Sequence, residues 1–399
     1  MVVDELSLIL PGDISGHDLW AVHAPVIWTM VEGQERVADG IALGQGHTIT
    51  AVGPYSQFQR DLPAHVVAVE TALAPGLFNS HVHLELSHLK GATVSGKGFL
   101  AWVKSLMASP MQAVDEHHVR TAVRRMRDQG TVFAADIATR RPELTSKVLA
   151  EDLPLSRIFA EFIGFSGPQP PSREFPWPPT ALEALKAYPD KVSAAGHALY
   201  STSAELLQHV KAWCRRQGKP FSIHLAEHEG EEMALSGIGE LYAMLSQSLI
   251  PASHVPPEKR PMALAHELGL LDSSTLAVHC VRLSADELAV FKETGASLCL
   301  CPRSNEYIGV GQADWKTMRK LNIPLCLGTD SLASNTDLSL WNELRFLLEK
   351  SPTHITLAEA LMWMTVNPAR IMGYAAHAGT LAPGKLAAFS VVPGDLSGL

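Results

Sequence analysis

Charged residues are scarce in this chain: they make up 18% of its 399 residues, below the average of about 25% for soluble proteins. Hydrophobic residues reach 46%, a composition that excludes a disordered or coiled-coil protein and favours a large core. Basic residues are outnumbered, and the net charge of −9 leaves no basic surface of the kind that nucleic acids need. The sequence therefore predicts a globular protein with no nucleic-acid partner.

The chain also lacks an uncharged apolar run as long as the roughly 18 residues that a membrane span needs. Its N-terminal segment is MVVDELSLIL, in which acids precede the apolar stretch, the wrong order for a secretion signal. We therefore expect a cytoplasmic protein with no membrane partner. The sequence leaves the oligomeric state open, a homo-oligomer included.

Cysteine is sparse as well: the five cysteines are an odd number in a long chain, so we do not expect a disulfide framework. Cys299 and Cys301 lie two apart in the apolar run ASLCLCP and share one face of a strand. Such a pair can bind a soft metal, but two buried core thiols are the better interpretation. Histidine, with 18 copies, is more suggestive.

The two ends of the chain have the same strand-like composition. Residues 1–73 are rich in Val, Ile, Thr and aromatic residues, with Gly and Pro between the runs. The C-terminal segment, AGTLAPGKLAAFSVVPGDLSGL, has the same character. We therefore expect a small β domain formed from residues 1–73 and 376–399, beside a second domain of residues 74–375.

The middle of the chain alternates short apolar runs with amphipathic, helix-like stretches. Helix N-termini are indicated at Ser203 and Ser284, and by the capping-box pattern from Thr356 to Glu359. Eight buried strands alternating with helices favour an α/β fold of the (β/α)8 TIM-barrel type over a doubly wound sheet. The eight expected strands are 75–84, 131–138, 157–164, 191–199, 221–227, 275–280, 296–302 and 324–330. Proline-rich loops are expected at 166–180 and 247–262.

Polar residues terminate these apolar runs, and in a parallel barrel the catalytic groups come from the C-terminal ends of the strands. A single histidine at such a position is more often a core or surface residue than a ligand. Several strand ends with His or Asp in one barrel favour a functional site instead. The residues at these ends are His81, His83, Asp136, Glu161, His197, His224 with Glu227, His279, Arg303 to Asn305, and Asp330.

The histidines predict a metal site. His81 and His83 lie two apart on one strand, so both side chains point to the same side, into the barrel mouth. Three or four neutral imidazoles and one carboxylate suit Zn²⁺, or Fe²⁺, with one position left for water. The other ligands expected are His224, His279 and Asp330. At the end of the fourth strand, where related barrels often carry a carboxylated lysine that bridges two metals, this chain has His197, which favours one divalent ion.

Glu227 is the candidate proton carrier. It follows His224 by three residues, where the strand enters the next loop, so its carboxylate can reach the water position without binding the metal. The neighbouring Glu229, Glu231 and Glu232 look like the solvated first turn of a helix, where acids are favourable.

The ordered motifs between residues 74 and 373 resemble those of the amidohydrolase superfamily, in its deaminase and chlorohydrolase branch. The motifs are PGLFNSHVHLE, GHALYSTS, HLAEHEGE, AVHCVRLS, CPRSN and GTDSLASNTDLSLWNELR. The resemblance implies a (β/α)8 barrel, a flanking β-sandwich from both termini, and hydrolytic deamination of an aminated heterocycle.

The same resemblance implies roles for the site residues. Asp330 helps to generate hydroxide at the metal, Glu227 moves a proton to a ring nitrogen, and ammonia leaves. His279 is implied on the metal or beside its water, where it steadies the oxyanion, and His197 contacts the substrate.

Within the branch, HVHLELSHLKG followed by GKGFLAWVKSLM looks most like the aminodeoxyfutalosine deaminases of the menaquinone pathway. Relatives also act on methylthioadenosine and S-adenosylhomocysteine, and that alternative stays open. The benzoate of aminodeoxyfutalosine favours a cation at the mouth. Candidate substrate contacts are Phe99 and Trp102 for stacking, Glu85 for a ribose hydroxyl, Arg303, Lys97 and Arg140 for the carboxylate, and also His197 and Asn305.

Two further alternatives remain. A triazine chlorohydrolase shares the metal ligands but releases halide instead of ammonia. A relative that acts as a non-catalytic scaffold typically lacks one or more ligands, whereas this chain retains every expected one.

Overall fold

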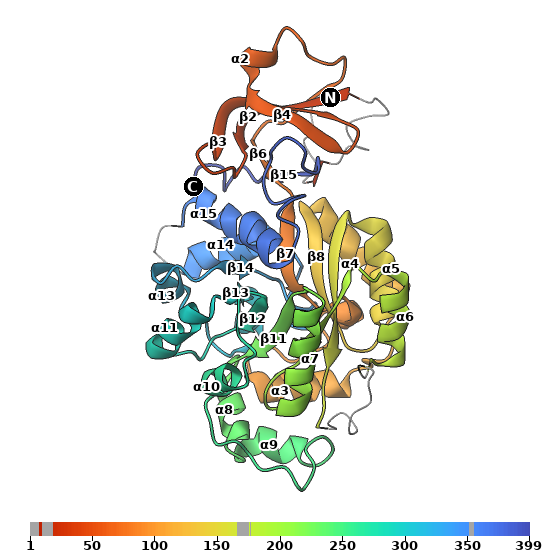
Figure 1. The fold of residues 1–399 in the computed structure, drawn as a ribbon, viewed down its shortest axis with the longest axis vertical. Helices are drawn as coiled ribbons and strands as arrows, with labels where there is room; N and C mark the ends of the chain where they lie inside the picture. Colours follow the sequence, from red (N-terminus) through yellow and green to blue (C-terminus); the bar gives the residue numbers. More distant parts are fainter. Residues whose placement is uncertain (1–7, 10–18, 166–174, 176, 351–354) are drawn as a thin grey trace.

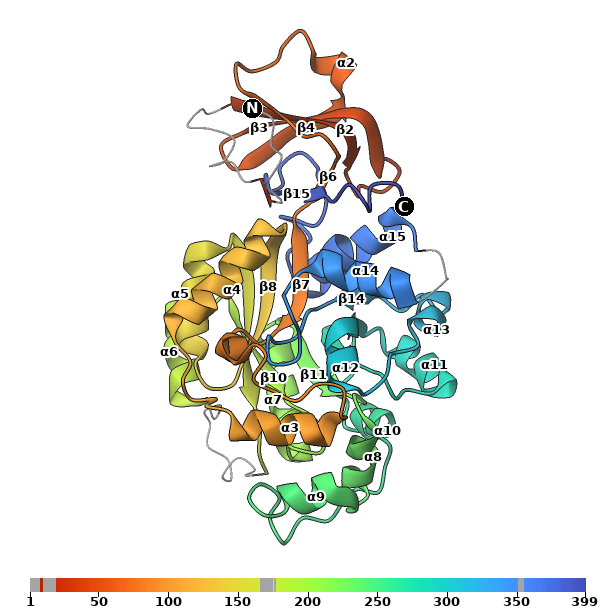
Figure 2. The same cartoon turned by 180° about the vertical axis from the view of Figure 1, so that it is seen from behind.

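The computed structural model describes residues 8–9, 19–165, 175, 177–350 and 355–399. Its strands form two sheets, one of eight strands and one of seven. Figures 1 and 2 show the smaller sheet at one end of the molecule and the larger sheet below it, surrounded by helices. Most of the proline-rich segment 166–180 lies outside the described residues.

The eight-stranded sheet is entirely parallel, and its strands are neighbours in chain order. Its strands are buried along almost their whole length, which explains why they read as continuous apolar runs. This arrangement confirms the predicted (β/α)8 barrel, with each strand inside or overlapping an expected run. The strands are β7 (Leu77–Val82), β8 (Thr131–Ala138), β9 (Leu155–Phe162), β10 (Val192–Gly196), β11 (Phe221–Leu225), β12 (Thr275–His279), β13 (Ser297–Leu300) and β14 (Leu325–Leu327).

Helices lie between the strands and cover the outside of the barrel (Figure 1). In α4, buried Val119, Ala122, Val123 and Met126 recur at helical spacing and form the face that packs inward. The helices of the barrel are η1 (Leu84–Leu89), α3 (Phe99–Ala108), α4 (Glu116–Asp128), α5 (Pro142–Asp152), α6 (Pro179–Ala187), α7 (Ala204–Arg216), α8 (Glu229–Leu235), α9 (Gly239–Leu245), α10 (Pro261–Glu267), α11 (Ala285–Thr294), α12 (Pro302–Ile308), α13 (Trp315–Lys320), α14 (Leu340–Lys350), α15 (Leu357–Leu361), the π-helical turn η2 (Met362–Val366) and α16 (Asn367–Ile371).

The three helix starts predicted from the sequence are confirmed. The Ser203 side chain accepts a hydrogen bond from the backbone amide of Leu206. Ser284 and Thr356 each begin a complete capping box, with Glu287 and Glu359 as the returning acids.

Contacts between β7 and β14 close the barrel. The Asn79 carboxamide donates to the Thr329 hydroxyl at 2.7 Å and accepts from the Thr329 amide at 3.2 Å. The carbonyl oxygen of His81 accepts the backbone amides of Thr329 at 3.1 Å and Asp330 at 3.0 Å. The seam of the barrel therefore brings the first and last strand ends together.

The seven-stranded sheet combines both ends of the chain. The C-terminal strand β15 pairs with β1 on one side and β6 on the other, in the order β1-β15-β6-β2-β3-β4, with β5 beside β2. This confirms that one small β unit is assembled from both termini. Its elements are β1 (Leu8–Ile9), β2 (Leu19–Trp28), β3 (Arg36–Gln45), β4 (Thr48–Pro54), α2 (Tyr55–Phe58), β5 (Val66–Ala68), β6 (Ala72–Pro75) and β15 (Phe389–Val392).

All five cysteines are buried free thiols, as expected for core residues. Among the described residues, the groups of side chains that could hold a metal include no cysteine. None of the described helices has both the length and the apolar character needed to cross a membrane.

We predict that replacing Asn79 with alanine lowers the free energy of unfolding by about 1–3 kcal/mol, because buried hydrogen bonds across the barrel seam are lost. Urea unfolding with an unchanged m-value measures this difference. The control is Gln208→Ala, which removes an exposed 3.3 Å hydrogen bond to the Leu268 carbonyl on the barrel exterior. Equal stability losses for the two variants would contradict the proposed importance of the seam.

Candidate metal centre and its cavity

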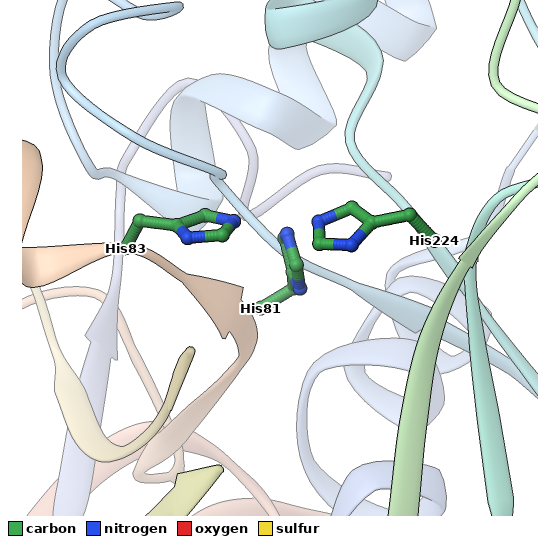
Figure 3. A group of neighbouring side chains, drawn as sticks. All are labelled: His81, His83 and His224. Atoms are coloured by element: carbon green, nitrogen blue, oxygen red, sulfur yellow. The ribbon is translucent and has the colours of Figure 1, made fainter. Parts of the chain in front are cut away.

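Three imidazoles converge at the C-terminal end of the barrel. His81 lies in β7, His83 follows it, and His224 lies in β11; one ring nitrogen of each lies within 4.8 Å of the others. Figure 3 shows the three rings pointing toward one another. His81 is fully buried, and neither of its ring nitrogens has a hydrogen-bond partner among the described residues. Because a buried polar atom without a partner is unfavourable, this donor set fits a bound cation.

Burial keeps these imidazoles neutral. It lowers the pKa of His81 well below its usual value and lowers the pKa of His83 to about 3. Burial also lowers the pKa of His224, whose Nδ1 donates to the His197 carbonyl oxygen at 3.0 Å, so that Nε2 is free to bind. A neutral imidazole is the form that binds a metal ion. The His197 carbonyl thereby fixes the orientation of the His224 ring.

Asp330 borders the three imidazoles from the opposite side of the barrel seam. Its Oδ1 lies 3.7 Å from Nε2 of His83 and 3.9 Å from Nε2 of His81. The hydroxyls of Ser304 and Ser334 donate to Oδ2 at 2.6 and 3.0 Å. Burial alone would raise the pKa of Asp330, but nearby His83 and His279 and the Ser304 hydroxyl lower it below its usual value. The carboxylate is thus held in its ionised form.

His279 and Glu227 form the next part of the site. Nδ1 of His279 donates to the Asn305 carboxamide oxygen at 2.9 Å, which leaves Nε2 directed at the Oε1 of Glu227, 3.8 Å away. Burial raises the pKa of Glu227 to about 8. A carboxyl group with a pKa near neutrality can both accept and release a proton, as a general acid–base needs.

These groups line one cavity of about 410 Å³. Its inner end is polar, and its outer end is formed by α3, the loop after it, and α9. The apolar outer lining comprises Phe99, Trp102, Val103, Leu106, Met107, Met111, Ile163, Leu241, Met244, Leu245 and Leu249. The cavity therefore suits a ligand with one polar end and one apolar end.

The structure places several of the predicted substrate contacts on this lining. Phe99 stacks on His228 with ring centroids 3.6 Å apart, and the Trp102 indole donates to the Ala333 carbonyl oxygen at 3.0 Å. His197 also lines the cavity, with Nδ1 2.5 Å from the Ser201 hydroxyl. Their contact with a substrate stays a prediction.

Glu85 lines the cavity and also holds a neighbouring loop in place. Its buried carboxylate accepts the backbone amides of Thr139, Arg140 and Arg141 at 3.2, 2.9 and 3.0 Å. It also lies 3.5 Å from Nη1 of Arg140. Glu85 therefore holds the loop after β8, and with it Arg140, against the cavity.

Three other predicted contacts lie elsewhere. Arg303 forms an ion pair with Asp337 at 2.7 Å and is absent from the described cavity lining. Asn305 lies behind His279, to which it is hydrogen bonded. Lys97 lines a separate surface hollow near α8 and α9. The geometry gives these three residues no direct place beside a bound substrate.

Glu161 is a site residue to which sequence reasoning assigned no role. Its Oε2 accepts the Thr139 hydroxyl at 2.6 Å, whereas Oε1 is buried, has no hydrogen-bond partner among the described residues, and lies 3.6 Å from Nδ1 of His224. Glu161, His197 and His224 form a second group of close donor atoms. The available signal was its position as the charged residue near the C-terminal end of β9.

A parallel (β/α)8 barrel with a histidine cluster and an ionised carboxylate at its strand ends defines a metal-dependent hydrolase. The chain belongs to the amidohydrolase family, whose sequence profile matches residues 72–398.

Several proteins similar to this chain carry the name of a deaminase. The chain is 25% identical to the aminodeoxyfutalosine deaminase of Deinococcus radiodurans, over 82% of this chain and 79% of the relative. It is 26% identical to the 5-methylthioadenosine/S-adenosylhomocysteine deaminase of Syntrophobacter fumaroxidans, over 94% of this chain and 84% of the relative. The solved Helicobacter pylori aminofutalosine deaminase in complex with methylthio-coformycin has a TM-score of 0.78 at 22% identity, over 93% of this chain and 91% of that one. The last likeness shows the shared fold.

Glu343, a buried carboxyl group behind the site, predicts how the stability of the protein depends on pH. Burial raises the pKa of Glu343 to about 8, although it accepts the Arg303 amide and the Asn335 carboxamide. The unfolded value is about 4.3, so folding favours the protonated form. Its contribution to stability is therefore full below about pH 4 and is lost as the pH rises through 8.

We expect Glu343→Gln to remove this dependence. Measured by urea unfolding from pH 4 to pH 8.5, the stability of the wild type should fall relative to that of the variant as the pH rises. Glu349→Gln, a change at the surface end of the same helix, is the control. Parallel pH profiles for wild type and Glu343→Gln would contradict the raised pKa.

Proposed function

We propose that the protein is a metal-dependent hydrolytic deaminase of 6-aminopurine nucleosides, with aminodeoxyfutalosine as its substrate. The observation that carries this proposal is the convergence of three neutral imidazoles, ionised Asp330 and Glu227 at the inner end of one cavity, which all but the buried His81 line. The named activities of the relatives support the reaction type.

The metal that best suits the donors is one Zn²⁺ ion, since imidazole and carboxylate are ligands that zinc favours. Fe²⁺ is the alternative. The residues that would hold the ion are His81, His83 and His224, with Asp330 and His279 next to it. When bound, such an ion makes water a nucleophile at neutral pH.

The protein's own residues then move the protons. Asp330 is ionised and can accept a proton from the attacking water at Oδ1. Glu227 carries a proton at its carboxylate and delivers it to a ring nitrogen. The proton on Asp330 then passes to the amino nitrogen, and the hydroxyl of the tetrahedral intermediate returns a proton to Glu227, so that ammonia leaves and a carbonyl forms. Because Asn305 accepts the Nδ1 proton of His279 and burial lowers the pKa of this imidazole, its Nε2 has a lone pair that can accept a hydrogen bond from the attacking water.

The lining argues for the kind of substrate. Arg140 is the only Arg or Lys among the described residues that line the cavity, and Glu85 and Met111 flank its guanidinium. Beside it, the apolar outer end suits an aromatic ring or a thioether. A benzoate-bearing nucleoside uses both features, whereas methylthioadenosine, the second candidate, uses only the apolar surface.

The wider setting follows from this substrate. The reaction belongs to menaquinone biosynthesis and takes place in the cytoplasm. Residues 74–375 would form the catalytic domain, and residues 1–73 with 376–399 the small β domain beside it.

The test is a screen for ammonia release from 6-aminopurine nucleosides, including aminodeoxyfutalosine, methylthioadenosine and S-adenosylhomocysteine. We expect activity that is lost with a chelator and restored by Zn²⁺. Glu227→Gln should lower kcat by about 10²–10⁴-fold, because the proton carrier is lost. The exposed Glu229→Gln is the matched control and should keep full activity.

Other outcomes distinguish the alternatives. Release of halide from a chlorotriazine, with no ammonia from any nucleoside, would indicate a chlorohydrolase. A protein that purifies without stoichiometric metal and keeps its function in Asp330→Asn would be a scaffold.

A second test separates the two nucleoside candidates. Arg140→Met should raise KM for aminodeoxyfutalosine by about 10–100-fold, the loss expected for a hydrogen bond to a charged group. KM for methylthioadenosine should not change. The adjacent Arg141→Met is the control, because the Arg141 guanidinium is paired with Glu143 instead. Equal effects on both substrates would contradict the role of Arg140 in binding a carboxylate.

A further inference from the structure

Glu227 lies directly after a strained turn of the backbone. Ala226, the residue between β11 and Glu227, has a φ of +49°, in the left-handed region that residues with a Cβ seldom adopt. Such a conformation is unfavourable for a non-glycine residue and persists only where its surroundings hold it. The direction of the Glu227 side chain therefore depends on whatever fixes this turn.

The carbonyl groups of the turn are held by the extension of β12. The Cys280 amide donates to the Leu225 carbonyl oxygen at 3.0 Å, and the Arg282 amide donates to the Ala226 carbonyl oxygen at 2.8 Å. These bonds fix the carbonyl side of the turn, and its amide side needs a separate acceptor.

Glu231 supplies that acceptor. Its Oε2 accepts the backbone amide of Glu227 at 3.1 Å. This bond holds the amide side of the turn, opposite the carbonyl groups that the Cys280 and Arg282 amides hold.

This geometry differs from an ordinary helix start. His228 is the N-cap of α8, and Glu231 is therefore its N3 residue. A glutamate at N3 usually reaches back to the amide of the N-cap residue itself. Glu231 instead reaches the preceding residue, Glu227, and is only 1% exposed, whereas Glu229 in the same turn is exposed.

A buried carboxylate is unfavourable unless its contacts compensate for the loss of water. A solvated acid would serve equally well as the first turn of a helix, so the helix start does not account for burial at position 231. The hydrogen bond from the Glu227 amide to Glu231 Oε2 accounts for it.

We propose that Glu231 is a positioning residue that holds the Ala226–Glu227 turn and thereby aims the Glu227 carboxylate at the reacting atoms. It is absent from the described lining of the cavity, so it acts through Glu227 and not on the substrate. The inference rests on the proposed function, because it takes Glu227 as the proton carrier.

The first experiment is Glu231→Leu, which removes the acceptor and keeps the site apolar. We expect kcat to fall by about 10²-fold, the effect of misplacing a catalytic group by about 1 Å. KM and the bound zinc should not change, because the substrate contacts and the imidazoles are untouched. Glu231→Gln keeps one acceptor oxygen and should recover most of the activity, and Glu229→Gln should match the wild type.

The second experiment separates positioning from general stability. In the Glu227→Gln background, Glu231→Leu should cause no further loss of kcat, since residues that act as a unit are non-additive. A full additional loss would overturn the proposal, and so would wild-type kcat in Glu231→Leu. If Glu231→Leu does not fold, Glu231→Asp, which withdraws the carboxylate from the Glu227 amide by one methylene, takes its place with the same expectations.

A crystal structure of the Glu231 variant makes the test independent of activity. The Ala226–Glu227 turn should relax, and the Glu227 carboxylate should move away from His279. An unmoved Glu227 would overturn the proposal. If the wild type releases no ammonia from any nucleoside, the proposed function fails, but this structure still decides whether Glu231 positions Glu227.

Discussion

Closure of the barrel between β7 and β14 is the constraint on which the site depends. The His81 carbonyl oxygen accepts the amides of Thr329 and Asp330, and Asn79 binds Thr329 from the neighbouring position. The same seam that completes the sheet therefore sets the carboxylate of Asp330 less than 4 Å from two imidazoles. Without this closure, groups separated by some 250 residues would have no fixed relation to one another.

Backbone strain at the strand ends is a second consequence of bringing polar groups together at the mouth of the barrel. Ala226, His279, Cys280 and Asp330 all have positive φ values, between 49° and 69°. Each lies where a buried strand turns into a loop, and two of them, His279 and Asp330, have side chains that line the cavity. The strain is held by hydrogen bonds such as the Ser331 amide to Asp330 Oδ1 at 2.8 Å and His279 Nδ1 to the Asn305 carboxamide oxygen at 2.9 Å. The geometry of the site is thus maintained by neighbours of the imidazole cluster.

The sequence predicts the barrel well because its signal is local: buried parallel strands read as uninterrupted apolar runs, and their polar ends stand out. It predicts the direction of side chains beyond those ends poorly. His279 is the last residue of β12, whereas Arg303 lies three residues beyond β13, where α12 turns its guanidinium toward Asp337 instead of the cavity. Glu231 reads as a solvated helix start, because nothing local reveals that the preceding turn presents the Glu227 amide to it. In both cases the deciding partner comes from tertiary structure.

The polar inner end and the apolar outer end of the cavity differ in what they contribute: the first concerns the reaction, and the second concerns the choice of substrate. In the proposed function, the imidazoles, Asp330 and Glu227 determine which bond is broken, and they do not select what is attached to the reacting ring. The outer end is built from α3 and α9, elements outside the barrel's own strands. Beside it lies Arg140, the one Arg or Lys among the described lining residues, which Glu85 holds in place. Since Glu85 follows His83 by two residues, the segment that carries the clustered imidazoles also fixes the loop that bears Arg140. With Arg140 in its proposed role, a change that alters discrimination between a carboxylate-bearing nucleoside and a thioether leaves the reactive end undisturbed only if Glu85 is kept.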